Sequence, residues 1–411
     1  MKCRHCNTRL EKVFVDLQYS PPCNAMLKPA QLNEPEIYYP LKIYVCENCY
    51  LVQVDEIEKA VNIFNSEYTY FSSYSTSWLA HARNYVDVIL SRFDFPQDAL
   101  VIEIASNDGY LLQYFRQRGL SVLGVDPAAN TADAAREKGI DTIVDFFGSD
   151  FARRKLVAHG NQGDLIVGNN VLAHVPDIND FVKGMRIALK QNGIITMEFP
   201  HLMRLVEEAQ FDTIYHEHYS YLSFSVVNRI FAEQRLVIFD VEELPTHGGS
   251  LRIYARHSEN KLHAITSAVA RLLEKETQAG MNDATYYEGF QDRVDNVKNA
   301  LLSFLLQQKR NDKKVIAYGA AGKGNTLLNY CGIKGSDLIS FAVDASPHKQ
   351  GRYLPGSHIP VVGIDAIMDF KPDFIVILPW NLKEEISEQL SYVKEWGCRF
   401  VVPIPEVVIL G

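Results

Sequence analysis

A dense group of titratable and phenolic side chains lies near the middle of the chain, in DTIYHEHYSYLS at residues 212–223. The central residues, YHEH, have three alternative interpretations: a catalytic metal site, an acid–base group or a polar part of the surface. On a strand, His216 and His218 would share one face. Zinc enzymes more often use H-E-x-x-H on a helix, however, and a third ligand motif is not apparent. Histidine titrates near neutral pH, so the segment favours acid–base chemistry.

Two C-x-x-C pairs contain four of the seven cysteines: Cys3 with Cys6, and Cys46 with Cys49. This is the spacing of zinc knuckles, in which a tight turn points two thiolates at one ion. Two redox pairs are the alternative, but these need a thioredoxin-like strand–helix context that is not apparent. A four-thiolate site has no open position for a substrate. The pattern therefore predicts a structural zinc ion.

Length and composition restrict the class of protein. A chain of 411 residues predicts two or three domains, and 47% apolar with 22% charged residues is ordinary for a globular protein. The net charge of −9 argues against a nucleic-acid partner. No apolar run is long enough to span a bilayer, and MKCRHCNTRL lacks an apolar signal core. We expect a cytoplasmic, monomeric enzyme with no membrane partner.

The residues between 99 and 201 alternate apolar strands with helical patterns. ALVIEIAS, LSVLGVDPA, GDLIVGNNVLAHV and GIITMEFPH are expected strands, and GYLLQYFRQRG is an expected helix. This alternation predicts an α/β fold with a parallel sheet and helices on both faces. The pattern of residues 257–311 predicts amphipathic helices. A second alternation of strands and helices then begins at KKVIAYGAAGKGN. A second, smaller α/β unit is therefore predicted.

The turn IASNDG, after the first of these strands, lies where open α/β folds bind nucleotides. It lacks G-x-G-x-x-G, and its acids would repel a pyrophosphate but suit a ligand with a cationic amino-acid end, such as S-adenosylmethionine. An acid closing the next strand would accept the ribose hydroxyls. Alternatively, these acids are only turn residues. The predicted cofactor-binding residues are Glu103, Ala105, Ser106, Asn107, Asp108, Gly109, Asp126, Asp145, Phe146, Asn169 and Asn170.

A glycine-rich loop, YGAAGKGN, ends a strand of the second α/β unit and opens a helix. Its amides and lysine could face the diphosphate of a substrate, with NAD as the rival occupant. Two further glycines in HGGSLRIY form either a tight turn or a close approach to the substrate. The predicted substrate-binding residues are Gly248, Gly249, Gly319, Lys323, Asn325 and Asp344.

With these motifs in their order along the chain, the sequence resembles the sugar C-methyltransferases that act on nucleotide-linked keto-deoxyhexoses and make branched sugars such as tetronitrose and mycarose. The resemblance rests on the four cysteines, EIASNDGYLL, GNNVLAHVPD, MEFPH, YHEHYSYLS, HGGSLRIY and YGAAGKGNTLLNY. One departure is Ala105, where such enzymes usually carry a glycine. The resemblance implies a zinc-binding domain at residues 1–66, a class I methyltransferase domain with a Rossmann-like sheet at 67–256, and a sugar-nucleotide-binding domain at 257–411.

The resemblance also implies methylation of C-3 of a 4-keto sugar and assigns catalysis to Tyr70, His174, Tyr215, Glu217 and His218. Carbon beside a ketone becomes nucleophilic only when its proton is removed, so a base and donors to the enolate oxygen are required. We expect His218 as the base, although Tyr215 or Glu217 could serve instead. His174 could also be a core or helix-capping histidine.

Three questions stay open at this point. The nucleotide carrier could be dTDP or GDP. An NAD-dependent sugar-nucleotide enzyme would use the C-terminal glycine-rich loop. A zinc-bearing binding protein without catalytic activity is the third possibility.

Overall fold

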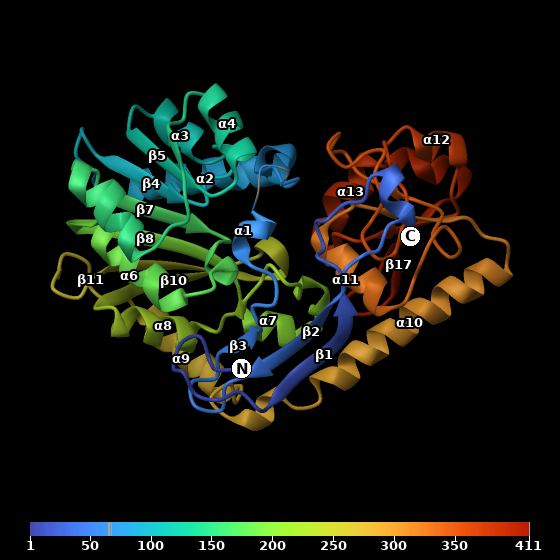
Figure 1. Ribbon diagram of the computed structural model, residues 1–411, viewed down its shortest axis with the longest axis horizontal. Coiled ribbons are helices and arrows are strands. Elements are labelled where there is room, and N and C mark those ends of the chain that lie inside the picture. The colour runs from blue at the N-terminus through green and yellow to red at the C-terminus, as the bar shows by residue number, and fades with distance from the viewer. Residues whose placement is uncertain (65, 67, 411) are drawn as a thin grey trace. The chain divides into compact units, whose positions relative to one another are not determined.

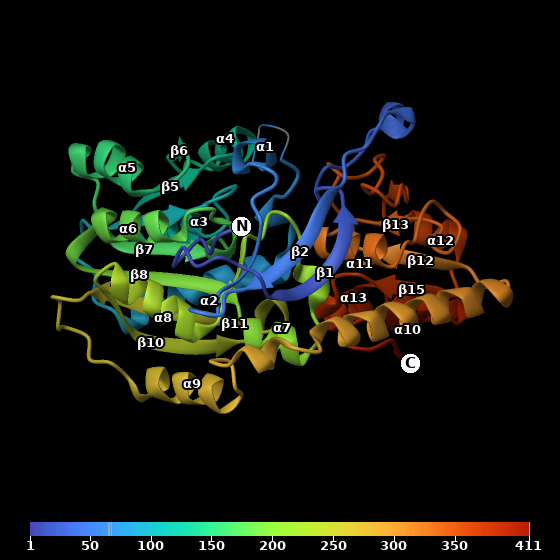
Figure 2. The same cartoon turned by 60° about the horizontal axis from the view of Figure 1, so that its bottom comes forward.

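The computed structural model describes residues 1–64, 66 and 68–410. Its contacts divide the chain into two compact units, and many of the helices and strands are labelled in Figures 1 and 2. Both units combine segments that are distant in the sequence. The division into three domains stays a prediction. The first unit comprises Met1–Lys12, Val45–Met203 and Glu217–Tyr286, and the second comprises Val13–Tyr44, Arg204–His216 and the chain from Tyr287 onward.

A seven-stranded sheet in the order β10-β11-β8-β7-β4-β5-β6 forms the centre of the first unit (Figure 1). The five strands from β8 to β6 are parallel, and β11 is antiparallel to both of its neighbours. The carboxyl ends of β4, β5, β7 and β8 therefore share one edge, where open α/β sheets bind ligands. The strands are β4 Leu100–Ile104, β5 Ser121–Asp126, β6 Thr142–Val144, β7 Gly163–Asn169, β8 Leu189–Pro200, β10 Leu236–Leu244 and β11 Ser250–His257.

Helices pack against this sheet through apolar side chains. Ala82, Tyr85 and Ile89 on one side of α2 are buried in a core with Val101 and Val167 from the sheet. Side-chain caps begin α2, α6 and α8, as expected for Ser and Asp at these positions. The helices of the first unit are α1 Ala60–Ile63, α2 Thr76–Arg92, α3 Leu112–Gln117, α4 Ala129–Glu137, α5 Ser149–Phe151, α6 Ile178–Ala188, α8 Phe224–Glu233 and α9 Ser267–Gln278.

A smaller six-stranded sheet, in the order β14-β13-β12-β15-β16-β17, forms the second unit. Its strands are parallel except for β17. The long helix α10 runs along the sheet (Figure 2), and its Phe304 meets Phe374 edge to face. The elements are α10 Phe290–Arg310, β12 Val315–Tyr318, α11 Gly322–Tyr330, β13 Ala342–Val343, β14 Val361–Val362, α12 Ala366–Phe370, β15 Phe374–Ile377, α13 Lys383–Gln389, β16 Arg399–Val402 and β17 Val408–Leu410.

Short antiparallel pairs complete the described structure. Strand β1, Val13–Ser20, pairs with β2, Tyr39–Val45, and β3, Val52–Val54, pairs with β9, Ser220–Tyr221. The short helix α7 covers Leu202–Glu207. Within the residues that the structure describes, no helix is both long and apolar enough to cross a bilayer.

Candidate active site and metal centre

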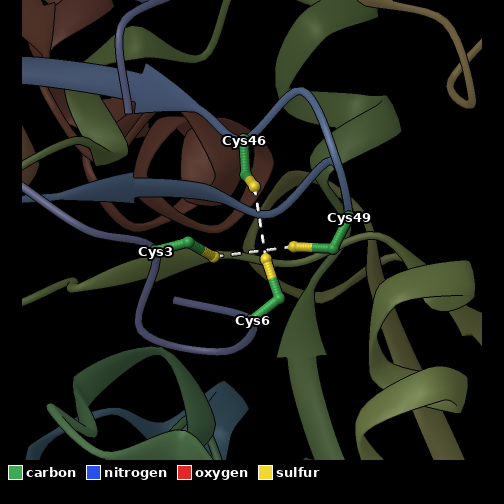
Figure 3. Close-up of side chains that lie close together, drawn as sticks. All are labelled: Cys3, Cys6, Cys46 and Cys49. Carbon is green, nitrogen blue, oxygen red and sulfur yellow. Dashed lines mark hydrogen bonds between the residues drawn. The ribbon is translucent and has the colours of Figure 1, made fainter. Parts of the chain in front are cut away.

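The four cysteines of the two C-x-x-C pairs converge in the first unit (Figure 3). Both pairs form the same turn. The amide of Asn7 donates to the carbonyl of Cys3 over 2.9 Å, and the amide of Tyr50 donates to the carbonyl of Cys46 over 2.8 Å. Asn7 and Tyr50 both adopt left-handed backbone conformations, with φ of 61° and 62°. The repeated turn aims two thiols from each pair at one point.

The sulfur positions fit a tetrahedral zinc ion. The Sγ atoms of Cys3 and Cys49 lie 3.5 Å apart, as do those of Cys6 and Cys46, and all four lie within 4.8 Å of one another. A Zn–S bond of about 2.3 Å in a tetrahedron requires sulfur atoms about 3.8 Å apart. Disulfide sulfurs would be bonded at about 2.05 Å. With four thiolates, the site is closed to substrate and stabilises the fold.

The predicted cofactor loop connects β4 to α3 at the carboxyl edge of the sheet. Ala105 stands where a glycine is usual, and it nevertheless takes the left-handed conformation, with φ of 58°. Asn107 does the same, with φ of 48°. The amide of Asn107 donates to the carboxylate of Asp126 over 2.8 Å, and Thr131 donates to the other oxygen over 3.0 Å. Asp126 therefore holds the loop to the end of β5, while burial raises its pKa.

Two further acids of this loop differ in their surroundings. Glu103 is fully buried, and burial raises its pKa well above the usual range. Asp108 is also buried, but its carboxylate forms an ion pair with Lys138 over 3.0 Å. A cationic ligand group at this edge would therefore gain more from Glu103 than from Asp108. Ser106 and Gly109 are buried within the same loop.

Tyr70 lies in the segment next to this loop. The side chain of Asn107 donates to the carbonyl of Tyr70 over 3.1 Å, and it accepts from the amide of Ser72 over 2.8 Å. Asn130 donates to the carbonyl of Tyr68 over 2.8 Å. The Tyr70 side chain itself is 45% exposed. The segment is thus tied to the cofactor loop through its backbone. Burial of the Tyr70 phenol group raises its pKa.

The remaining predicted cofactor residues lie at the ends of β6 and β7. Asp145 is half-buried and accepts from the amide of Phe146, whose ring is exposed. Both amide atoms of Asn169 are buried and lack a hydrogen-bond partner among the described residues. Asn170 contacts the ring of His247, with the amide nitrogen 3.0 Å from Nε2. All of these residues belong to the first unit.

The structure brings three of the predicted catalytic residues together in the first unit. The rings of His174 and His218 meet edge to face, with centroids 4.5 Å apart. Burial lowers the pKa of His174 to about 4, although a hydrogen bond with the backbone of Glu217 acts to raise it. Glu217 is buried. His174 is therefore neutral at pH 7, and it lies beside an imidazole that could accept a proton.

The YHEH segment divides between the two units. Tyr215 and His216 belong to the second unit, and Glu217 and His218 to the first. His216 lies 3.2 Å from the carbonyl of Pro40, whereas His218 packs on His174. Within this segment only Ser220–Tyr221 form a strand, β9. The backbone turns at 216–217, so the alternation of a strand does not place the two histidines on one face.

Sequence reasoning missed a buried polar group on β8, β11 and α2. The carboxylate of Glu198 accepts from Arg252 over 2.8 Å and lies 2.8 Å from the Nε2 atom of His81. These two side chains lower the pKa of Glu198 although burial opposes the change. The ring of His81 stacks on Trp78, with centroids 4.9 Å apart. The signal in the sequence was Glu198, an acid between the apolar residues Met197 and Phe199 of a predicted strand.

The glycines of HGGSLRIY form the turn between β10 and β11. Gly248 and Gly249 have φ of 84° and 113°, a region that favours glycine. His247 precedes them with φ of 55°. Of the two expectations for these glycines, the tight turn is observed. A role in substrate binding stays a prediction.

In the second unit, the glycine-rich loop begins helix α11 beside a cluster of polar side chains. Lys323 donates to Asn381, and its Nζ lies 4.5 Å from the centre of the Trp380 ring. The indole of Trp380 donates to Asp212 over 2.7 Å. Burial lowers the pKa of Lys323 to about 8 and raises that of Asp212 to about 6. Both amide atoms of Asn325 are buried and lack a partner among the described residues.

Two other predicted substrate residues, one in this loop and one after β13, have evident structural roles. Gly319 has φ of 91°, and a Cβ atom there would lie 2.5 Å from the Cδ atom of Pro379. Asp344 accepts from the amide of Ala320 over 2.8 Å and lies 3.3 Å from the Nζ atom of Lys349. An anionic ligand is attracted by a cation and repelled by a carboxylate. Lys323 therefore suits such a ligand better than Asp344 does.

Comparisons with known proteins agree with the fold. Residues 78–237 match the family described as "Methyltransferase domain", residues 3–64 match "Putative zinc binding domain", and residues 245–405 match "C-methyltransferase C-terminal domain". The chain is 35% identical to the C-methyltransferase NovU of Streptomyces niveus over 376 residues, which cover 92% of this chain and 89% of that protein.

Solved structures show lower similarity. Magnesium protoporphyrin IX methyltransferase from Synechocystis, with bound S-adenosylmethionine, is 14% identical and has a TM-score of 0.34, with 44% of this chain and 79% of that chain covered. An S-adenosylmethionine-dependent methyltransferase from Mesorhizobium loti is 13% identical and also has a TM-score of 0.34. The alignment covers 44% of this chain and 100% of that chain.

The strand order with its reversed β11, together with the methyltransferase-domain match, defines a class I methyltransferase that uses S-adenosylmethionine. The four-cysteine centre and the matches along the chain make the identification narrower. The chain belongs to the zinc-bearing C-methyltransferase family. The predicted family, fold class, methyl donor and zinc centre are thereby confirmed.

Proposed function

We propose that this C-methyltransferase methylates C-3 of a nucleotide-linked 4-keto-6-deoxyhexose. The edge-to-face contact between His174 and His218, next to the buried Glu217, carries the proposal. Methylation of carbon beside a ketone needs a proton acceptor and a site that excludes water from the resulting enolate. A pair of imidazoles, one of them held neutral, suits that reaction.

In this mechanism the sugar ketone lies near the histidine pair. His218 removes the proton from C-3, and Glu217 orients the imidazole. His174 stays neutral because its pKa is about 4, so it can donate a hydrogen bond without repelling the proton on His218. Tyr70 and Tyr215 position the sugar and donate to the enolate oxygen. Tyr215 and Glu217 are the alternative candidates for the base.

The methyl donor is assigned to the carboxyl edge of the first sheet. Asp126 would accept the ribose hydroxyls, Glu103 would face the cationic amino-acid end, and Asn169 would offer its unpaired amide. Asp145 and Phe146 would border the adenine. When bound, S-adenosylmethionine would supply an electrophilic methyl group on its sulfonium: the new bond to C-3 of the enolate would form as the C–S bond breaks, and the sulfur would leave as the thioether of S-adenosylhomocysteine.

The nucleotide diphosphate of the substrate is assigned to the glycine-rich loop of the second unit. Lys323 supplies an ammonium, and the N-terminal turn of α11 presents its backbone amides, as helix N-termini do to phosphates. Gly248, Gly249, Gly319, Asn325 and Asp344 complete the proposed substrate residues. Proton removal and methyl transfer require no hydride acceptor, so NAD is not part of the proposal.

A substrate screen tests the proposed function. The full chain with S-adenosylmethionine is mixed with dTDP- and GDP-linked 4-keto-6-deoxyhexoses, and the sugar is analysed by mass spectrometry and NMR. The expected product carries one additional methyl group, bonded to C-3. A methyl group on oxygen, or turnover of neither set of sugars, would contradict the proposal.

A further inference from the structure

Asn170, the first residue after β7, is held in an unusual conformation. Its φ is 55°, and its amide donates to the carbonyl of Glu198 at the end of β8 over 2.8 Å. Its side-chain nitrogen lies 3.0 Å from the Nε2 atom of His247. Its side-chain oxygen is buried without a hydrogen-bond partner among the described residues. One end of this amide is therefore paired with His247, and the other end remains available to a ligand.

The contact with His247 decides which way the amide points. An amide nitrogen can only donate, so the Nε2 atom of His247 must accept, which requires the neutral tautomer protonated at Nδ1. The oxygen of Asn170 is then directed away from His247. Because a buried acceptor without a donor is unfavourable, a ligand that brings an N–H group would satisfy this oxygen.

His247 is itself braced by the first unit. Its ring meets Trp78 of α2 edge to face, with centroids 5.0 Å apart. Trp78 stacks in turn on His81, whose Nε2 atom lies 2.8 Å from the carboxylate of Glu198. The ring is therefore supported from α2 and β8, in addition to its own turn.

The position of Asn170 favours a cationic donor. Strand β7 pairs in parallel with β4, and Val167 lies opposite Glu103. Asn170 and the buried Glu103 thus lie at the same edge of the sheet. A buried carboxyl group, whose ionised form a nearby cation would favour, and an unpaired amide oxygen at one edge are complementary to an ammonium group.

We propose that His247 is a positioning residue that orients Asn170 to accept a hydrogen bond from the ammonium of S-adenosylmethionine. This inference rests on the proposed cofactor pocket. His247 itself makes no contact with the cofactor in this scheme. Replacing His247 should therefore weaken only those ligands that carry the amine. A general loss of structure would instead weaken all adenosyl ligands alike.

The experiment compares three nucleosides by calorimetry on the full, zinc-loaded chain. S-adenosylhomocysteine has both the amine and the carboxylate, decarboxylated S-adenosylmethionine has only the amine, and 5′-methylthioadenosine has neither. His247→Phe keeps a ring against Trp78 but removes the acceptor. We expect it to weaken the two amine-bearing ligands about tenfold and to leave 5′-methylthioadenosine within about twofold. His247→Gln, which keeps an acceptor, should restore binding.

A second variant, Asn170→Asp, distinguishes an effect of His247 on the orientation of residue 170 from an effect on folding. In Asn170→Asp both side-chain oxygens accept, so no orientation has to be imposed. Adding His247→Phe to Asn170→Asp should therefore cost no further affinity for the amine-bearing ligands. Asp126→Asn serves as the control for the shared ribose and should weaken all three ligands alike.

Equal losses for all three nucleosides with His247→Phe would overturn the inference, because they would show a structural role. Unchanged affinities would overturn it as well. In both cases the cofactor assignment would stand, since the wild-type chain would still bind the nucleosides. A wild-type chain that bound none of them would instead overturn the proposed cofactor pocket, and the inference with it.

Discussion

The rings of His174 and His218 meet edge to face, with centroids 4.5 Å apart and planes inclined by 73°. His174 ends the 3-10 turn Leu172–His174 after β7, and His218 precedes β9. Burial keeps His174 neutral by lowering its pKa to about 4. Since a neutral neighbour does not repel a proton, this relationship leaves His218 free to become charged during the reaction.

Replacing His218 with asparagine should abolish proton removal from C-3. A general base typically contributes about 10²–10⁴-fold, so we expect deuterium exchange at C-3, measured by NMR without methyl donor, to fall at least about 100-fold. Glu217→Gln should reduce exchange less, because it changes only the orientation of the imidazole. Exchange at the wild-type rate in His218→Asn would transfer the role of base to Tyr215 or Glu217.

The pH profile should not depend on His174. With a pKa of about 4, this imidazole keeps its neutral form between about pH 5 and 9. His174→Gln should therefore lower kcat without moving the acid limb of the kcat/KM profile. If the fall of kcat/KM at acidic pH disappeared in His174→Gln, the prediction would be wrong, because His174 would then be the group that titrates.

Nucleoside diphosphate binding should weaken as the pH rises through about 8. The pKa of Lys323 is lowered to about 8 by burial, so its ammonium is present below that pH and lost above it. Calorimetry with dTDP and GDP should show this loss in the wild-type chain. Lys323→Arg should remove the pH dependence, because a guanidinium stays charged. An identical pH dependence in both proteins would assign the titration to another group.

Removal of one zinc ligand should release the metal. We expect Cys46→Ser to lose its stoichiometric zinc, measured by plasma mass spectrometry, and to melt at a lower temperature, because metal binding is coupled to folding. Cys398→Ser is the matched control, since Cys398 is a buried cysteine outside the cluster. Full zinc content in Cys46→Ser would contradict the assigned ligand set.

The buried ion pair between Glu198 and Arg252 should contribute to the stability of the first unit. Glu198→Gln removes the closer and more deeply buried of the two carboxylates at the Arg252 guanidinium, since Glu242 lies 3.2 Å away on the other side. Breaking comparable buried pairs costs about 3–5 kcal/mol. Because the pKa of Glu198 is lowered in the folded chain, its contribution is present above the unfolded-state pKa. The contribution is lost as the pH falls through the folded-state pKa.

Urea unfolding at neutral and acidic pH provides the measurement for this pair. The difference between Glu198→Gln and wild type should be large at neutral pH and should shrink in acid. Lys275→Gln provides a surface control, because the exposed pair with Glu243 should be worth about 1 kcal/mol or less. Equal small effects for the two variants would refute the stabilising role of Glu198.

Features with short-range causes could be predicted from the sequence. The zinc ligands were evident because a knuckle is a local turn, closed within five residues by Asn7 in one case and Tyr50 in the other. The alternating apolar runs likewise predicted the parallel strands, and a tight turn was one of the two expectations for the glycine pair. The two-residue spacing of His216 and His218 would give them one face only on a strand, and a turn at residues 216–217 breaks that alternation.

The sequence by itself thus determined the chemistry that is available: four thiols for zinc, acids at successive strand ends and a group of imidazoles. Only the tertiary structure decided which of these groups meet. His174 contacts His218, Asn170 contacts His247, and Glu198 contacts both His81 and Arg252. The physical reason is that partners so far apart in the chain are selected by the order of strands in the sheet. The burial that follows sets their pKa values, and no local pattern records it.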